Sequence, residues 1–191
     1  MYYKKILAAA LTVSCIGGIV PANSVQAASL KIRYSGKTRY YKGKQLHVSY
    51  ANKNLSSKYV GIQINKVNMI PYYDYLVKQG PKVKRTYSKS SGKLILKNGD
   101  DTLTAYVGKR TYYLNGVKKT FSVAPTKVKY YKTKKTIILI PANAIVKGLG
   151  LNYKYSSSSK RIYITQPVIP SDSTTPVSYT HLRAHETRSN L

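Results

Sequence analysis

Apolar and polar residues alternate in short segments through the middle of the chain. Alternation with period two at 46–50 and 61–64 indicates strands with one buried face. Asn98-Gly99 and Asn115-Gly116 separate neighbouring segments and are typical of tight hairpin turns. Strands spaced so closely by turn residues predict antiparallel pairing. The other expected strands are 94–96, 103–107, 111–114, 120–123, 136–140 and 162–165.

Two prolines mark the expected helices. A helix is predicted over 72–79, between Pro71 and Gly80, and a second over 142–147, after Pro141. Proline is favoured at the first helical position and glycine just past the last one. The chain is therefore expected to be an α+β protein, rich in antiparallel strands and containing two short helices.

The same order of segments occurs twice. Met69-Ile70-Pro71, a short helix and a strand at 94–96 form one copy, and Leu139-Ile140-Pro141, a helix and a strand at 162–164 form the other. The offset is 70 residues at the proline and 68 at the last strand. Two copies are too few for a solenoid, which needs about three. We expect a pseudo-repeat of about 70 residues. Its first, divergent copy is expected in 28–110 and its second in 111–165.

The first 27 residues have the pattern of a secretory signal peptide. Lys4 and Lys5 precede an apolar stretch from Ile6 to Val20, and Val25-Gln26-Ala27 fits the small-x-small cleavage pattern. The stretch is too short for a good membrane span, so no transmembrane span is expected in the mature chain. We therefore expect a secreted, extracellular protein of the cell envelope.

The composition changes after the last predicted strand. Residues 166–176 are rich in Pro, Ser and Thr, which is typical of a linker. Residues 177–191 contain two of the three histidines and the single glutamate. Their reverse translation resembles a transposase-type sequencing adapter read in frame. We interpret 177–191 as an assembly artefact and give its His and Glu residues no functional role.

Basic residues far outnumber acidic ones. Between residues 28 and 176 there are 29 basic and four acidic residues, a net charge of 29 − 4 = +25. Such a surplus favours a polyanionic partner: a wall polymer such as teichoic acid, anionic lipid headgroups or nucleic acid. An AT-rich genome is an alternative source of many Lys and Tyr codons, but it does not explain the scarcity of Glu. The export signal favours a cell-wall polyanion or peptidoglycan over nucleic acid.

Tyrosines lie next to basic residues at several points, which predicts a surface for sugars and phosphates. Exposed tyrosine rings stack on flat ligand faces, while Lys or Arg hold anionic groups. In alternating strands about half of these tyrosines would instead face inward and pack in the core. The candidate anion or glycan contacts are Arg39, Tyr40, Tyr41, Lys42, Lys129, Tyr130, Tyr131, Lys132, Lys154 and Tyr155.

The expected mature chain offers little for catalysis. Its histidine is His47, and its acidic residues are Asp74, Asp100, Asp101 and Asp172. Asp74 falls in the first turn of a predicted helix, where a carboxylate favours the dipole, and Asp100-Asp101 are typical turn residues. No two of them form a recognisable catalytic pair. We therefore expect no enzymatic activity, no metal and no cofactor.

Six short motifs follow one another along the second half of the chain: Asn115-Gly116, Ala124-Pro125, Thr136–Pro141, Leu149-Gly150, Tyr153–Tyr155 and Lys160–Ile164. In this order they resemble the copper amine oxidase N-terminal-like domain, or stalk domain, of secreted proteins from low-GC Gram-positive bacteria. The resemblance covers 111–165 well and 40–108 more loosely, and it implies a non-catalytic domain without copper or quinone chemistry. Ala142-Asn143 departs from the Pro-x-Arg turn usual in the family.

Two hypotheses about function follow. The first is a secreted, non-catalytic stalk or binding module at the cell envelope, in contact with anionic wall polymers. The alternative is the N-terminal targeting region of a truncated peptidoglycan hydrolase, an amidase or peptidase, whose catalytic domain follows the linker. Zinc ligands or a Cys–His pair downstream would mark the alternative. An adhesin or assembly component with further repeats is a third, weaker interpretation.

Overall fold

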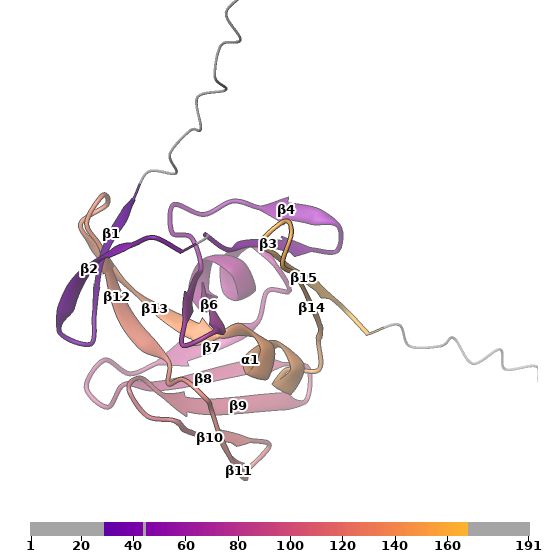
Figure 1. Cartoon of the computed structure of the whole chain (residues 1–191). Helices are drawn as coiled ribbons and strands as arrows, with labels where there is room; N and C mark the ends of the chain where they lie inside the picture. Colours follow the sequence, from indigo (N-terminus) through magenta and orange to yellow (C-terminus); the bar gives the residue numbers. More distant parts are fainter. Residues whose placement is uncertain (1–28, 44, 168–191) are drawn as a thin grey trace, which may run out of the picture.

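Three β-sheets and two short helices make up the described part of the chain (Figure 1). The computed structural model describes residues 29–43 and 45–167. The expected signal peptide, the linker from residue 168 onward and the segment 177–191 lie outside the described residues. The predicted fold class, antiparallel and β-rich with two short helices, is confirmed.

The strands are arranged in sheets of six, five and four. The largest sheet has the spatial order β2 (Lys37–Tyr41), β1 (Leu30–Tyr34), β12 (Thr126–Tyr130), β13 (Lys135–Pro141), β6 (Val67–Pro71) and β5 (Ile62–Ile64). The second has the order β11 (Val117–Thr120), β10 (Thr111–Leu114), β9 (Asp101–Tyr106), β8 (Lys93–Asn98) and β7 (Lys84–Tyr87). The third has the order β14 (Asn152–Ser156), β15 (Arg161–Thr165), β3 (His47–Tyr50) and β4 (Lys53–Leu55). Among the strand pairs of the described residues, only β15 and β3 run parallel to each other.

The two Ile-Pro motifs pair with each other in the middle of the six-stranded sheet. In the antiparallel register of β6 and β13, Ile70 lies opposite Ile140, and both are fully buried. These two side chains belong to the larger core, whereas Met69 and Leu139 belong to a second core. Because successive strand residues point to opposite faces, this central pair is buried on both sides.

Strands of the two proposed repeats are mixed in every sheet. Each Ile-Pro strand and helix continues into a hairpin, β7–β8 in the first repeat and β14–β15 in the second. The hairpin turns share a serine arrangement: Ser88 Oγ lies 3.1 Å from Ser90 Oγ, and Ser156 Oγ lies 3.0 Å from Ser158 Oγ. In the four-stranded sheet, β15 of the second repeat pairs with β3 of the first. In the five-stranded sheet, β9 of the first repeat pairs with β10 of the second. Each sheet thus contains strands from both proposed repeats.

Each helix follows a strand that ends in proline. β6 ends at Pro71 and β13 at Pro141, so the prolines do not occupy the first helical position that we expected. The first helix, η1 (Tyr73–Gln79), is a π-helix, and the second, α1 (Ala142–Gly148), is an α-helix. A proline is tolerated at a strand end because it only removes one ladder hydrogen bond.

A glycine at position 80 allows the backbone to fold back closely at the C-terminal end of η1. Its N–H donates to the carbonyl oxygen of Tyr75 at 3.1 Å, a bond between residues five apart. A Cβ at this position would lie 2.2 Å from the same oxygen. Glycine is therefore required because any side chain would collide with the backbone that it caps.

One predicted strand, at 120–123, is misplaced. The strand in this region is β11, which starts directly after the Asn115-Gly116 turn, where φ is 49° and 84°. A two-residue turn of this type fixes the pairing register, so the strand ends at Thr120. Phe121 then turns inward, where its ring stacks on Tyr112 with 3.9 Å between centroids.

A buried tyrosine in η1 makes stability depend on pH. Tyr75 is 1% exposed, and burial together with the Asp74 carboxylate raises its pKa to about 12. The unfolded chain loses this proton near the ordinary pKa of 10.0, whereas the folded chain keeps it to about 12. This contribution to stability is therefore complete below pH 10 and is lost as the pH rises toward 12.

We expect the free energy of unfolding, measured by urea denaturation, to fall over that range. It should fall less steeply in Tyr75→Phe, because that variant lacks the titrating hydroxyl. The comparison between the two chains cancels the titration of lysines, which both share. Identical pH slopes in the two chains would show that the Tyr75 hydroxyl does not titrate as described.

Candidate functional site

Strands β2, β1 and β12 bring two of the tyrosine–basic clusters together at one edge of the six-stranded sheet. β1 lies between the other two, with Lys31 opposite Tyr40 on β2 and Arg33 opposite Lys129 on β12. Side chains two residues apart on a strand share a face, so the outward residues form one surface. We call this surface the cationic face. It consists of Lys31, Arg33, Thr38, Tyr40, Lys129 and Tyr131.

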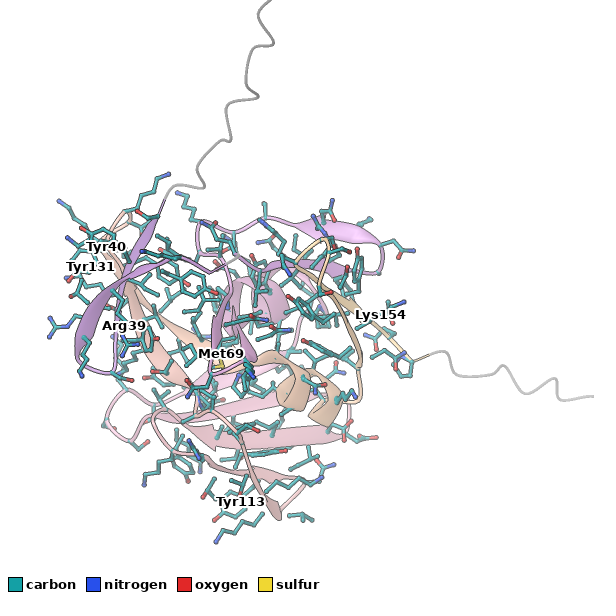
Figure 2. The ribbon with its side chains drawn as sticks, viewed as in Figure 1. Arg39, Tyr40, Met69, Tyr113, Tyr131 and Lys154 are labelled. Carbon is teal, nitrogen blue, oxygen red and sulfur yellow. The ribbon has the colours of Figure 1, made fainter. Side chains whose placement is uncertain are left out.

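Lysines and tyrosine rings alternate across the cationic face. Lys31 Nζ lies 5.5 Å from the ring centroid of Tyr40 and 5.0 Å from that of Tyr131. Lys129 Nζ lies 5.4 Å from the centroid of the same Tyr131 ring. Figure 2 shows Tyr40 and Tyr131 together at one end of the molecule. Tyr40 is 59% exposed, so its ring is open to a ligand.

The electrostatic potential of this face favours negative charge. The Tyr131 hydroxyl is 3.0 Å from Thr38 Oγ1. This hydrogen bond, with the charges of Lys129, Arg33 and Lys31, lowers the pKa of Tyr131 below its ordinary value. Arg33 and Lys129 also lie directly opposite each other, and like charges in that position destabilise a sheet. A bound anion would relieve this repulsion, since it would be attracted to both side chains.

Several candidate tyrosines face the interior instead. Tyr130 is 2% exposed, its hydroxyl donates to the Val60 carbonyl oxygen at 2.6 Å, and burial raises its pKa. Tyr41 is partly buried against the same core, and its hydroxyl accepts the Gln63 N–H at 2.9 Å. The inward orientation of both side chains follows from strand alternation, because their neighbours Tyr131 and Tyr40 point outward. Tyr130 is therefore not available to a ligand.

The remaining candidates lie outside the cationic face. Arg39 is opposite Ile32 in the register, and its guanidinium carbon lies 4.9 Å from the Tyr34 ring centroid. Lys42 and Lys132 are exposed just past the ends of β2 and β12. Lys154 and Tyr155 lie on β14, and Figure 2 shows Lys154 on the other side of the molecule from Tyr40 and Tyr131. The structure thus brings only Tyr40, Lys129 and Tyr131 together on one surface.

Three residues of the cationic face were missed from the sequence: Lys31, Arg33 and Thr38. Their signal was present, because Leu30-Lys31-Ile32-Arg33-Tyr34 alternates between apolar and basic residues. Such alternation indicates a strand with one apolar and one basic side. The tyrosine–basic clusters each contain two tyrosines, whereas β1 contains one, Tyr34, so that pattern does not include β1.

Two acidic residues of the described part, Asp74 and Asp101, accept local hydrogen bonds. Asp74 accepts a hydrogen bond from Ser57 Oγ, and Asp101 accepts one from Asn115 Nδ2 at 2.9 Å. His47 is exposed on β3. Within residues 29–43 and 45–167, no three His, Cys, Asp or Glu side chains are grouped to hold a metal ion. The described residues therefore do not fit copper, which is usually held by imidazole and sulfur ligands.

The described residues contain no helix that is both long enough and apolar enough to cross a membrane. No curated protein and no solved structure matches the chain significantly. The sequence profile of the copper amine oxidase N-terminal domain matches residues 50–164, from the end of β3 to the end of β15. This domain is non-catalytic and stalk-like. The match covers more than half of the sequence, and the chain belongs to the copper amine oxidase N-terminal domain family.

Proposed function

We propose that this chain is an exported, non-catalytic module of the cell envelope that binds an anionic wall polymer through the cationic face. The observation that carries the proposal is the convergence of three cations around two tyrosine rings. Lys31, Arg33 and Lys129 meet there, and none of the six residues of the face is acidic. Repulsion among these cations has no evident benefit for folding, but it provides attraction for a polyanion.

Four of the six residues of the cationic face, Lys31, Arg33, Thr38 and Tyr40, lie before the region that the family profile matches. The family match begins at residue 50, whereas β1 and β2 end at residues 34 and 41. The β1–β2 hairpin therefore adds two strands to the matched region, on the β12 side of the sheet. This position supports a binding role for the hairpin, because a purely structural stalk does not need an extra pair of cationic strands.

The side chains suit a polymer with phosphate and hydroxyl groups. Arg33 can form two parallel hydrogen bonds to a phosphate, while Lys31 and Lys129 act as point charges. The exposed ring of Tyr40 offers a flat apolar surface for a sugar or polyol. Because the cations are solvent-exposed, the attraction should be strong at low ionic strength and screened by salt.

Co-sedimentation with purified Gram-positive cell walls tests this function. The full chain is mixed with intact walls and with walls from which acid has removed the phosphodiester-linked polymers, at about 0.01 M and about 1 M salt. We expect retention by intact walls at low salt, and a loss of at least about tenfold on adding salt or stripping the walls. Absence of binding at low salt, or binding that is indifferent to stripping, would overturn the proposal.

A further inference from the structure

We propose that a groove beside the cationic face binds successive phosphodiester groups of a polyol polymer. This inference rests on the proposed function and adds a site with two lysines, Lys89 and Lys127, that the tyrosine–basic pattern does not include. The groove has a volume of about 600 Å³, within the range of ligand sites. Its cationic lining is Arg33, Lys89, Lys127 and Lys129.

Three turns and the strands β1, β12 and β13 form the groove. The turns are the β1–β2 turn with Ser35-Gly36, the β7–β8 turn with Lys89 to Gly92, and the β9–β10 turn with Val107-Gly108. β12 contributes Lys127 and Lys129. The site therefore lies between the six-stranded and the five-stranded sheets, where segments from distant parts of the sequence meet.

Backbone hydrogen bonds hold these walls in place. The Val107 N–H donates to the Gly92 carbonyl oxygen at 3.0 Å, which joins the β7–β8 turn to the end of β9. The Gly108 N–H donates to the Pro125 carbonyl oxygen at 2.7 Å, which joins β9 to the residue before β12. A ligand thus meets preformed walls, and little ordering entropy is lost when it binds.

The charged side chains that line the groove are all positive among the described residues. Four of its lining side chains are cationic, and among the described residues that line it none is acidic. Arg33 and Lys129 are shared with the cationic face, so the groove continues that surface. One long anion could therefore contact Lys31 and Tyr40 on the face and Lys89 in the groove at the same time.

The turn that carries Lys89 does not need a lysine for its own structure. In the second repeat the corresponding turn has Ser157 at this position, with the same offset of 68 residues as the hairpin strands. Both turns keep the serine arrangement, since the Ser91 N–H lies 3.4 Å from Ser88 Oγ and the Ser159 N–H lies 3.3 Å from Ser156 Oγ. The serine hydrogen bonds thus stabilise the turn without Lys89, so the Lys89 side chain is available to bind a ligand.

Hydroxyl groups among the cations distinguish the expected ligand class. Ser91 Oγ accepts the Lys93 N–H at 3.3 Å, and a hydroxyl that accepts still carries a proton that it can donate. Thr126 and Thr136 add two more hydroxyls to the lining. Phosphates bind cations, and the hydroxyls of a polyol both donate and accept. Alternating phosphate and polyol units therefore suit this lining better than a carboxylate polymer does.

Equilibrium binding of a poly(glycerol phosphate) chain tests the groove. The full chain is compared with Lys89→Gln/Lys127→Gln and with a control of equal charge, Lys118→Gln/Lys119→Gln, on the exposed strand β11. The groove variant should lose at least about tenfold in affinity, and the control less than about threefold. Lys89→Arg/Lys127→Arg should restore binding. A polyglutamate probe should respond equally to the groove variant and to the control.

The outcomes separate the groove from the function on which it rests. If the unchanged chain does not bind poly(glycerol phosphate), both proposals fail. If it binds and the groove variant matches the control, only the groove fails. Single-stranded DNA binding more tightly with the same groove dependence would overturn the polyol class. Equal groove-dependent retention by phosphatidylglycerol vesicles would identify a lipid headgroup, not a polymer, as the source of the phosphodiester.

Discussion

Replacing Ile70 and Ile140 together by alanine is expected to unfold the chain at room temperature. The two side chains are fully buried and lie opposite each other where the proposed repeats meet. A buried Ile→Ala change costs about 2–5 kcal/mol, and neighbouring changes that enlarge one cavity do not add fully. We therefore expect a combined loss of about 4–8 kcal/mol, which is comparable to the whole stability of a typical domain.

Urea denaturation followed by circular dichroism and by tyrosine fluorescence measures this effect. Each single variant should show one transition that coincides by both probes, because every sheet contains strands of both proposed repeats. Val117→Ala, at a position that is 61% exposed, is the control and should change stability by less than about 0.5 kcal/mol. Two separate transitions, with only one of them shifted by Ile70→Ala, would mean that the repeats fold independently.

Reversing two charges on the cationic face should abolish wall binding. In Lys31→Glu/Lys129→Glu, the contacts with the Tyr40 and Tyr131 rings are lost and a polyanion meets repulsion. We expect a loss of about a hundredfold or more in affinity for intact walls at low salt. The fold should be retained, because both side chains are exposed and Lys129 no longer opposes Arg33 with like charge.

A charge-matched variant separates the face from the net charge of the protein. Lys118→Glu/Lys119→Glu makes the same change on β11, which Figure 1 shows at the opposite end of the molecule from β1 and β2. This control should lose less than about tenfold, since only long-range attraction is reduced. If both variants lose affinity equally, binding depends on total charge and the cationic face has no special role.

Local signals in the sequence predict much of the fold. The Asn-Gly turns and the positions of both helices follow from pairs of residues close in sequence, whose conformational preferences act locally. The pairing of Ile70 with Ile140 does not follow from such preferences. It depends on how two similar segments meet in space, and nothing in either segment indicates that its partner is the other copy. The π-helical form of η1 was likewise not visible, because Gly80 indicates only where the helix ends.

The candidate site was predictable only in part, because strand pairing decides which side chains share a surface. Composition predicts a cationic surface, and strand alternation predicts that one tyrosine of each Tyr-Tyr pair points outward. Which one does so depends on register, and the register of β2 and β12 comes from their pairing with β1. The groove was not predictable, because Lys89 and Lys127 are brought together only by the contact between two sheets.

Amide hydrogen exchange of the full chain, with and without purified wall polymer, tests the central claim most directly. The account predicts slower exchange on binding in residues 30–41 and 126–131, which contain the cationic face, and no change in β14, where Lys154 lies. High salt should remove the protection, because screening weakens the attraction. Protection confined to β14 and β15, or none at a polymer concentration that saturates binding, would contradict the account.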